Sequence, residues 1–203
     1  MSVRVCYFIR HGETDLNREF RCQGKQDVPL NETGRAQIAE TAKKLGEIEA
    51  DAVYASPLRR AVESAGIIAG SKNLTVMTLD WLAEIFYGEL EGMNFKECEA
   101  RFPGILRQFQ ADPESVTFPG GEPVRKVAER LCRGLGELLV KDSGTIFLVT
   151  HQIIGGIAKI VLEGRPFSSL WEDKLVNGGF FRSEITPEHI RRLENFGLPG
   201  MIL

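Results

Sequence analysis

The apolar residues of the chain gather in short runs that are separated by stretches of mixed polarity. The first run, VRVCYFI over residues 3–9, is rich in β-branched and aromatic residues and predicts a buried strand. The run TIFLVT over residues 145–150 predicts a second strand that is buried on both faces. Similar runs at 51–56 and 74–79 predict two further strands.

Between these runs the apolar residues recur at the spacing of an amphipathic helix. Pro57 stands directly after a predicted strand, where a helix start tolerates a residue without an N–H group. The pattern predicts helices at 33–47, 57–70, 95–102, 104–111, 122–142 and 153–163. Near the end of the chain, residues 175–185 and 189–196 predict a closing pair of strands.

Strands and helices alternate through most of the chain, which is typical of a layered α/β fold with a mainly parallel sheet. We therefore expect a three-layer α/β/α arrangement in which helices flank a central sheet. No linker, repeat or low-complexity segment divides residues 1–203, so a single domain is predicted. The irregular segment 80–121 combines aromatic residues and prolines with short helices, and we expect it to form a cap over the site.

The composition is that of an ordinary globular domain, with 43% hydrophobic and 26% charged residues among 203. A formal net charge of -3 argues against a broad basic surface, so we expect neither nucleic acid nor a membrane as a partner. The four cysteines show no C-x-x-C or zinc-ligand spacing, which predicts reduced thiols and a cytoplasmic location. No secretory leader and no membrane span are predicted.

Polar side chains follow the predicted strands at the points where the strands end. Two of the three histidines come directly after a buried strand, and arginines and a carboxylate accompany them. Because ligands bind beyond the carboxyl ends of parallel strands, we expect these side chains to converge on one edge of the sheet. They are Arg10, His11, Ser56, Arg59, Arg60, Glu84 and His151.

This set of side chains suits a tetrahedral oxyanion. Guanidinium groups bind such an ion through paired hydrogen bonds, and the helix that follows His151 adds backbone N–H donors. A phosphoryl group fits better than a carboxylate because it carries more charge and more acceptor oxygens. A dianion would also offset the repulsion between Arg10 and His11, and Gly12 allows a close approach of the backbone.

No metal-ligand motif and no G-x-x-x-x-G-K-[ST] phosphate loop accompanies the cluster, so we expect no metal and no cofactor. Phosphoryl transfer without a metal needs a nucleophile, cations for the phosphoryl oxygens and an acid for the leaving oxygen. A neutral histidine can be the nucleophile if a backbone carbonyl fixes its tautomer. Glu84 can be the acid if an apolar setting raises its pKa.

Five motifs, in this order, resemble those of the histidine phosphatase superfamily, in its phosphoglycerate mutase-like branch. RHGET at 10–14 is similar to the nucleophile motif, and the stretch 17–34 to the phosphate-side loop. SPLRRA at 56–61 is similar to the second arginine motif, LAEIFYGELEG at 82–92 to the acid motif, and VTHQ at 149–152 to the second histidine motif. The match covers nearly the whole chain, and small members of the family include broad-specificity phosphatases and α-ribazole phosphatase.

The resemblance implies catalytic roles for five residues. His11 would carry the phosphoryl group as a phosphohistidine, and Glu84 would protonate the leaving alcohol and then activate water. Arg10, Arg59 and His151 would bind the phosphoryl oxygens.

The resemblance also implies a substrate-binding group, made of Asn17, Gln23, Gly24 and the backbone N–H of Gln152. Gln152 stands where many family members have glycine or another small residue, so we expect it to narrow the pocket.

Several of these residues have a second interpretation. Arg59 can instead cap its helix or pair with a carboxylate, and Glu89 and Glu91 are alternatives to Glu84 as the acid. Other charged residues are interpreted as solvated: Arg60 and Arg21 as surface or rim residues, and His189 as an edge residue. The aromatic candidates for pocket walls are Phe86, Tyr87, Phe95 and Phe118.

The predicted activity is the hydrolysis of small phosphomonoesters, by a monomer or a homodimer. The alternative enzyme is a phosphoglycerate mutase-like phosphotransferase. The resemblance implies that mutases of the family have a longer chain, with an insert that carries a pair of arginines. Here the stretch between Glu84 and His151 is short and has isolated basic residues only. The third hypothesis, a phospho-ligand binding protein without turnover, would be indicated by loss of His11 or Glu84, and both are present.

Overall fold

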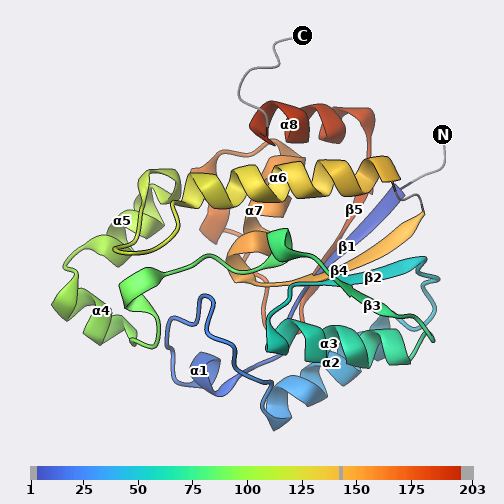
Figure 1. The fold of residues 1–203 in the computed structure, drawn as a ribbon, viewed down its shortest axis with the longest axis horizontal. Helices are drawn as coiled ribbons and strands as arrows, with labels where there is room; N and C mark the ends of the chain where they lie inside the picture. Colours follow the sequence, from blue (N-terminus) through green and yellow to red (C-terminus); the bar gives the residue numbers. More distant parts are fainter. Residues whose placement is uncertain (1–3, 142–143, 198–203) are drawn as a thin grey trace.

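The computed structural model describes residues 4–141 and 144–197, and its centre is a five-stranded sheet. The sheet has the order β3–β2–β4–β1–β5 (Figure 1). Its strands are β1 (Arg4–Arg10), β2 (Ala52–Ala55), β3 (Val76–Thr78), β4 (Thr145–Thr150) and β5 (Phe180–Ile185). The first four strands run parallel, and β5 pairs antiparallel with β1 at one edge. The predicted mainly parallel sheet is confirmed.

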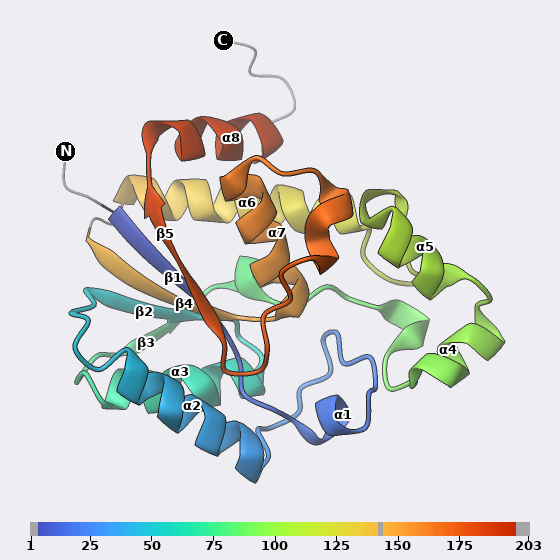
Figure 2. The ribbon, with the colours of Figure 1, turned by 180° about the vertical axis from the view of Figure 1, so that it is seen from behind.

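Helices cover both faces of the sheet, as Figures 1 and 2 show. One face packs against α2 (Glu32–Lys44) and α3 (Arg59–Gly70). The other packs against α6 (Val124–Lys141), α7 (Gln152–Glu163) and α8 (Pro187–Gly197). The three-layer α/β/α arrangement is therefore confirmed.

Alternation along the strands builds the two cores. On β1, Cys6 and Phe8 pack on the side of α6 and α7, whereas Tyr7 and Ile9 pack on the side of α2 and α3. Successive side chains of a strand point to opposite faces, so a strand that is apolar at every position is buried on both. This is the pattern that the runs VRVCYFI and TIFLVT predict.

The helices α4 and α5 of the segment between β3 and α6 lie to one side of the sheet (Figure 1). The elements of this segment are η1 (Asp80–Leu82), η2 (Gly88–Leu90), α4 (Phe95–Arg101), α5 (Ile105–Ala111) and η3 (Pro113–Ser115). The two predicted short helices are confirmed. Two small elements complete the fold: α1 (Asp15–Arg18) and η4 (Phe167–Trp171).

The predicted strand at 189–196 is wrong, because these residues form most of α8. Pro187 is the first residue of the helix, and the Thr186 hydroxyl accepts a hydrogen bond from the His189 N–H at 3.3 Å. Ile190, Leu193 and Phe196 recur every third residue and pack on the core. A proline at the first helical position and a threonine before it are start signals of a helix, not of a strand.

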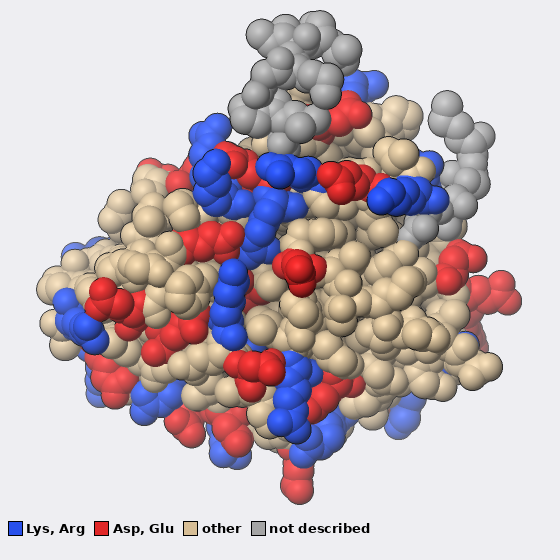
Figure 3. Space-filling view, viewed as in Figure 1, with Lys and Arg blue, Asp and Glu red and all other residues tan. Residues whose placement is uncertain are grey.

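Charged residues of both signs alternate on the surface. Lys and Arg side chains alternate with Asp and Glu along the row that α6 forms across the upper part of Figure 3. Among the described residues no helix is long and apolar enough to cross a bilayer.

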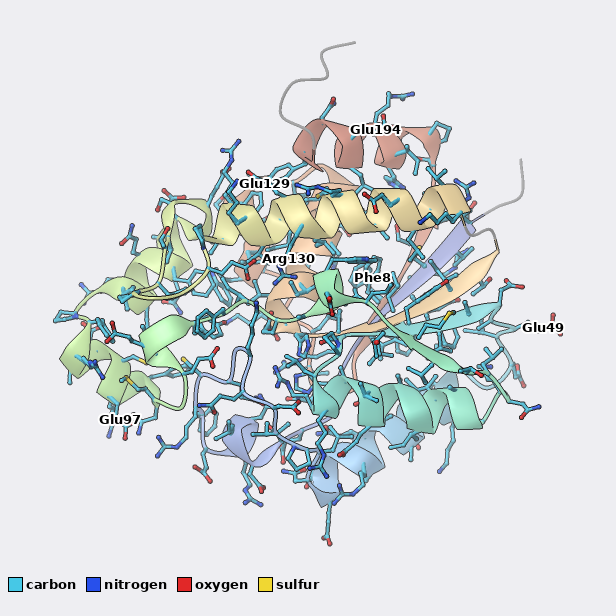
Figure 4. The ribbon with its side chains drawn as sticks, viewed as in Figure 1. Phe8, Glu49, Glu97, Glu129, Arg130 and Glu194 are labelled. Atoms are coloured by element: carbon cyan, nitrogen blue, oxygen red, sulfur yellow. The ribbon has the colours of Figure 1, made fainter. Side chains whose placement is uncertain are left out.

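Helix α6 holds the segment that leads to Glu84. Arg130 reaches from α6 (Figure 4) and donates to the carbonyl oxygens of Trp81 at 2.7 Å and Glu84 at 3.2 Å. The indole of Trp81 lies so close to Gly134 that a Cβ there would stand 2.2 Å from Cγ of the ring. Gly134 is therefore a contact site for this segment.

A pair of glycines in α6 tests this contact. We expect Gly134→Ala to lower the free energy of unfolding by about 1–3 kcal/mol, because overpacking forces neighbouring atoms to shift. Gly136→Ala should raise it by about 0.5–1 kcal/mol, since an added Cβ would meet no described atom within 4 Å beyond its chain neighbours and its own helix backbone, and alanine is the better helix former. Urea unfolding measures both, and equal stability of the two variants would contradict the close contact.

Candidate active site

The register of the sheet brings the two strand-end histidines together. Arg10 of β1 pairs with Thr150 of β4, and the backbone N–H of His11 donates to the Thr150 carbonyl at 3.0 Å. His11 and His151 are the next residues on neighbouring strands, and their ring centroids lie 5.1 Å apart. The predicted convergence of these two side chains is thus what the structure shows.

His11 is a buried imidazole with a defined tautomer. Its Nδ1 lies 2.6 Å from the carbonyl oxygen of Gly12, and a carbonyl can only accept, so Nδ1 carries the proton. The Nε2 lone pair is then available for reaction. Burial, and then the charges of Arg60 and Arg10, lower the pKa of His11 well below its ordinary value. The ring is therefore neutral at neutral pH, as a nucleophile requires.

Gly12 allows the chain to turn tightly after β1. A Cβ at this position would lie 2.3 Å from the carbonyl oxygen of Gly34, which no side chain tolerates. The Gly12 N–H donates to the hydroxyl of Ser64 at 3.2 Å. These contacts hold the carbonyl that fixes the His11 tautomer.

The prediction that Arg59 lines the site is wrong. Its guanidinium is exposed and donates to Glu63, one helical turn further on, at 2.7 Å. Arg60, interpreted from the sequence as a surface or rim residue, is 1% exposed and lines the pocket. Glu63 stands four residues after Arg59 and three after Arg60, and both are ion-pair spacings on a helix, so this local signal does not separate the two arginines.

Arg60 faces His11 while its other nitrogens are bound to a loop. Its Nε lies 3.3 Å from Nε2 of His11, and its Nη1 and Nη2 donate to the carbonyls of Gln26 and Gly24, each at 2.7 Å. Burial lowers the pKa of Arg60 to about 10, although the charge of Glu84 opposes the shift. The guanidinium thus stays charged at neutral pH beside the nucleophile.

Arg10 is held by Gln152, whose side chain has a role that the sequence did not suggest. Nη1 of Arg10 donates to Gln152 Oε1 at 2.6 Å and to the Leu175 carbonyl at 2.7 Å. Nε of Arg10 is buried and has no hydrogen-bond partner within the described part of the chain. Gln152 also lines the pocket, so it both borders the site and orients an arginine.

His151 is fully buried, behind the pocket wall and next to His11. Its Nε2 lies 2.7 Å from the Ser56 hydroxyl, which itself accepts from the Leu58 N–H at 3.3 Å. Ser56 can then donate its hydrogen to Nε2, which leaves the ring proton on Nδ1. That Nδ1 has no partner among the described residues, so it is free to donate to an anion.

Glu84 is a buried carboxyl on the pocket wall. Oε1 accepts from the Ile85 N–H at 3.1 Å, and Oε2 accepts from the Ile153 N–H, in the first turn of α7, at 3.2 Å. Burial raises the pKa of Glu84 above its ordinary value, and these two hydrogen bonds limit the rise. A carboxyl with a raised pKa can give up a proton and take it back near neutral pH.

Of the alternative acids, Glu91 binds a backbone N–H group and Glu89 lies on the exposed surface. Glu91 Oε1 accepts from the Lys25 N–H at 2.7 Å and lies where a Cβ on Gly24 would be. Glu89 forms an exposed ion pair with Arg101. Neither lines the pocket.

The predicted substrate-binding residues Asn17, Gln23 and Gly24 all line the pocket. The side-chain oxygen of Gln23 accepts from the Thr14 hydroxyl at 2.8 Å, and that of Asn17 accepts from Asn177 at 3.1 Å. Their amide NH2 groups are therefore the parts that can donate to a ligand. Gly24 has a φ of 51°, which favours glycine.

These residues surround one pocket of about 470 Å³, a size that suits a small organic ligand. The pocket is lined by the polar groups of Arg10, His11, Arg60 and Glu84 and by aromatic side chains. Among the predicted aromatic walls, Tyr87 and Phe95 line the pocket, whereas Phe86 and Phe118 do not.

Two further features concern metals and thiols. No group of three or more His, Cys, Asp and Glu is arranged to hold a metal ion in the part of the chain that the structure describes. Cys22 lines the pocket, and its sulfur lies 4.0 Å from that of Cys98. Burial raises the pKa of Cys22 to about 12, so its thiolate is scarce at neutral pH.

The fold and the site together define an α/β protein with a buried histidine in an oxyanion cradle. The chain belongs to the histidine phosphatase superfamily (branch 1), whose family model matches residues 6–195. The predicted family is thus confirmed.

Known relatives agree with this class. The uncharacterized phosphatase PhoE of Bacillus subtilis is 33% identical over 162 residues, which are 75% of this chain and 78% of PhoE. A mycobacterial glucosyl-3-phosphoglycerate phosphatase in complex with VO3 has a TM-score of 0.83 and 26% identity, over 88% of this chain and 92% of the other. A putative alpha-ribazole-5'-P phosphatase from Escherichia coli shares the fold, with a TM-score of 0.83 and 23% identity over 91% and 92% of the two chains.

The neighbouring arginines provide a test with an internal control. We expect Arg60→Ala to lower kcat/KM for a phosphomonoester by about 10²–10³-fold, which is typical of the loss of one oxyanion donor. Arg59→Ala should stay near the wild type, because its side chain is an exposed partner of Glu63. Steady-state kinetics and vanadate inhibition measure both, and a larger loss with Arg59→Ala would contradict this assignment.

Proposed function

We propose that the protein hydrolyses small phosphomonoesters without a metal ion, through a phosphohistidine on His11. The observation that carries this proposal is the neutral imidazole, protonated on Nδ1, whose Nε2 lone pair accepts from the buried guanidinium of Arg60 at 3.3 Å. A cation so close to an imidazole lone pair is favourable for a group that attacks a dianion, because the guanidinium neutralises the phosphoryl oxygens during attack. The phosphatases named among its relatives support the same class of reaction.

In the first step, Nε2 of His11 attacks phosphorus and the bond from phosphorus to the leaving oxygen breaks. Glu84 in its protonated form, which burial favours by raising its pKa, gives its proton to the leaving oxygen. Arg10, Arg60 and Nδ1 of His151 stabilise the charge on the phosphoryl oxygens. The alcohol product leaves, and the phosphoryl group stays on His11.

In the second step, water attacks phosphorus and the bond to Nε2 breaks. The Glu84 carboxylate takes a proton from that water, so the acid of the first step becomes the base of the second. His11 returns to its neutral form. Its Nδ1 keeps its proton in both steps, because that N–H donates to the Gly12 carbonyl. Phosphate is released.

Three arginines of the stretch between Glu84 and His151 favour hydrolysis over mutase activity. Arg101 pairs with Glu89, Arg107 with Glu99, and Arg125 with Glu114 and Glu129. None of the three arginines lines the pocket, so none is placed to grip a carboxylated substrate as a mutase insert would. The cap role of segment 80–121, the single domain, the monomeric or dimeric state and the cytoplasmic location stay predictions.

One assay separates the three candidate functions. The protein is incubated in EDTA with a panel of phosphomonoesters that includes 3-phosphoglycerate with and without a bisphosphoglycerate primer. Release of phosphate in EDTA is the expected result. Isomerised product without release would indicate a mutase, and tight binding without either product would indicate a binding protein. Acid-labile phosphoprotein should form in the wild type and be absent in His11→Ala.

The pH dependence of kcat/KM should follow the two ionisations. His11 reacts when neutral, and its lowered pKa moves the acid limb that it causes below the usual histidine range. Glu84 reacts when protonated, and its raised pKa moves the alkaline limb upward from the usual carboxyl range. Activity should thus be lost at low pH through His11 and at high pH through Glu84.

Glu84→Gln checks the alkaline limb. We expect it to abolish that limb and to slow phenyl phosphate by about 10²-fold or more, because general acid catalysis contributes about 10²–10⁴-fold. 4-Nitrophenyl phosphate should be slowed much less, since its leaving group needs no proton. Equal slowing of the two esters would remove Glu84 from the role of acid.

A further inference from the structure

The mechanism uses polar side chains of the pocket only, and the apolar side chains that line the same pocket have a distinct chemistry. Five apolar or aromatic side chains form what we call the outer wall: Tyr87, Phe95, Leu106, Phe109 and Trp171. They come from three separate stretches of the chain, the segment after η1, the helices α4 and α5, and η4. Such a wall contacts the alcohol part of a phosphomonoester, because the phosphoryl group lies at His11.

Most of the outer wall is rigid. The rings of Phe109 and Trp171 meet edge to face at 4.8 Å, and the indole N–H of Trp171 donates to the Phe109 carbonyl at 3.0 Å. Tyr87 packs edge to face on Phe118 at 4.9 Å, and Phe118 is buried. A wall that is already ordered loses little conformational entropy when a ligand binds.

Phe95 is the exception, because it is 58% exposed although it lines the pocket. It is the first residue of α4, whose cap is made by Asn94 and Glu97 and does not involve the ring. A large aromatic surface that faces water at the mouth of a pocket gains about 25 cal/mol for every Å² that a ligand covers. An apolar ligand group of ring size would cover it.

Two cationic side chains besides Arg10 and Arg60 line the pocket, and among the residues that the structure describes only one of them is paired with carboxylates. Arg21 lines the pocket, but its guanidinium is bound by Glu19, Glu97 and the Gly92 carbonyl. Lys174 also lines the pocket, with its Nζ 5.0 Å from the centre of the Trp171 ring.

The acidic neighbours of Lys174 are engaged elsewhere. Glu172 pairs with Arg165, and Asp173 pairs with Arg165 and Lys159. Within the described part of the chain, Lys174 has no carboxylate within ion-pair distance. It can therefore hold an anionic group of a ligand.

We propose, resting on the phosphatase function above, that the preferred substrates are phosphomonoesters of a ring-sized apolar alcohol that carries a carboxylate away from the phosphate. The ring lies between Phe95 and the rigid part of the outer wall, and the carboxylate lies at Lys174. Lys174 and Phe95 are then the residues that determine specificity, while the residues around His11 perform the same chemistry for every phosphomonoester.

Three substrates test the proposal on the full chain in EDTA: 4-carboxyphenyl phosphate, its neutral isostere 4-carbamoylphenyl phosphate, and glycerol 1-phosphate. We expect the wild type to show a KM about two- to fivefold lower for the carboxylate than for the amide, the range of an exposed ion pair. The difference should shrink as salt is added, because salt screens exposed charges. Both aryl esters should exceed glycerol 1-phosphate in kcat/KM.

Two variants and two matched controls locate the effect. Lys174→Gln should abolish the preference for the carboxylate over the amide. Lys25→Gln should retain it, since Lys25 also lies over an aromatic ring, that of Phe86 at 5.9 Å, but does not line the pocket. Phe95→Ala should lower kcat/KM for both aryl esters by about tenfold and leave glycerol 1-phosphate near the wild type. Phe20→Ala should leave kcat/KM for the aryl esters and for glycerol 1-phosphate unchanged, because Phe20 is 70% exposed and does not line the pocket.

The outcomes distinguish the two levels of the proposal. If no ester releases phosphate, the proposed function fails. If phosphate is released but the amide equals the carboxylate, or Lys174→Gln keeps the preference, the anionic subsite is overturned and the phosphatase function stands. If Phe95→Ala slows glycerol 1-phosphate as much as the aryl esters, the apolar subsite is overturned.

Discussion

The site depends on two guanidinium groups that are held against a neutral imidazole in a buried setting. Arg60 approaches Nε2 of His11 at 3.3 Å, and Arg10 leaves its Nε without a partner in the described part of the chain. Buried positive charge is costly unless an anion accompanies it. Burial, together with the same charges, keeps His11 unprotonated, so the setting that attracts a dianion also prepares the nucleophile. Binding and reactivity therefore have one electrostatic origin.

The rest of the fold keeps this arrangement in place. The pairing of β1 with β4 sets the two histidines at the same level, and backbone carbonyls of Gly12, Gly24 and Gln26 fix one imidazole and one guanidinium. Arg130 of α6 holds Glu84 in a similar way, because it donates to the backbone carbonyl of Glu84. These are contacts with backbone atoms, and backbone atoms move less than side chains. The outer wall of the pocket lies on other segments, so the substrate it admits can vary while the chemistry stays constant.

Much of the fold could be predicted, because continuous apolar runs and helical patterns of apolar residues report directly on which faces are buried. The strands and most of the helices follow these patterns, and α8 does so too once its period of three and Pro187 are noticed. The two arginines of α3 show where this reasoning ends. Arg59 and Arg60 are identical in chemistry and adjacent in sequence. They differ only in the face of α3 on which they lie, which makes Arg59 an exposed ion-pair partner and Arg60 a buried cation.

The sequence by itself determined the kinds of residues that end each buried strand, and hence the proposal of a cationic site with a histidine nucleophile and a carboxyl acid. It did so because a strand that is buried on both faces leaves only its end for polar chemistry. The tertiary structure alone decided which arginine meets His11, that Gln152 orients Arg10, and that Lys174 and Phe95 join one pocket. Those facts depend on the packing of segments far apart in the chain, and no local pattern of residues records such packing.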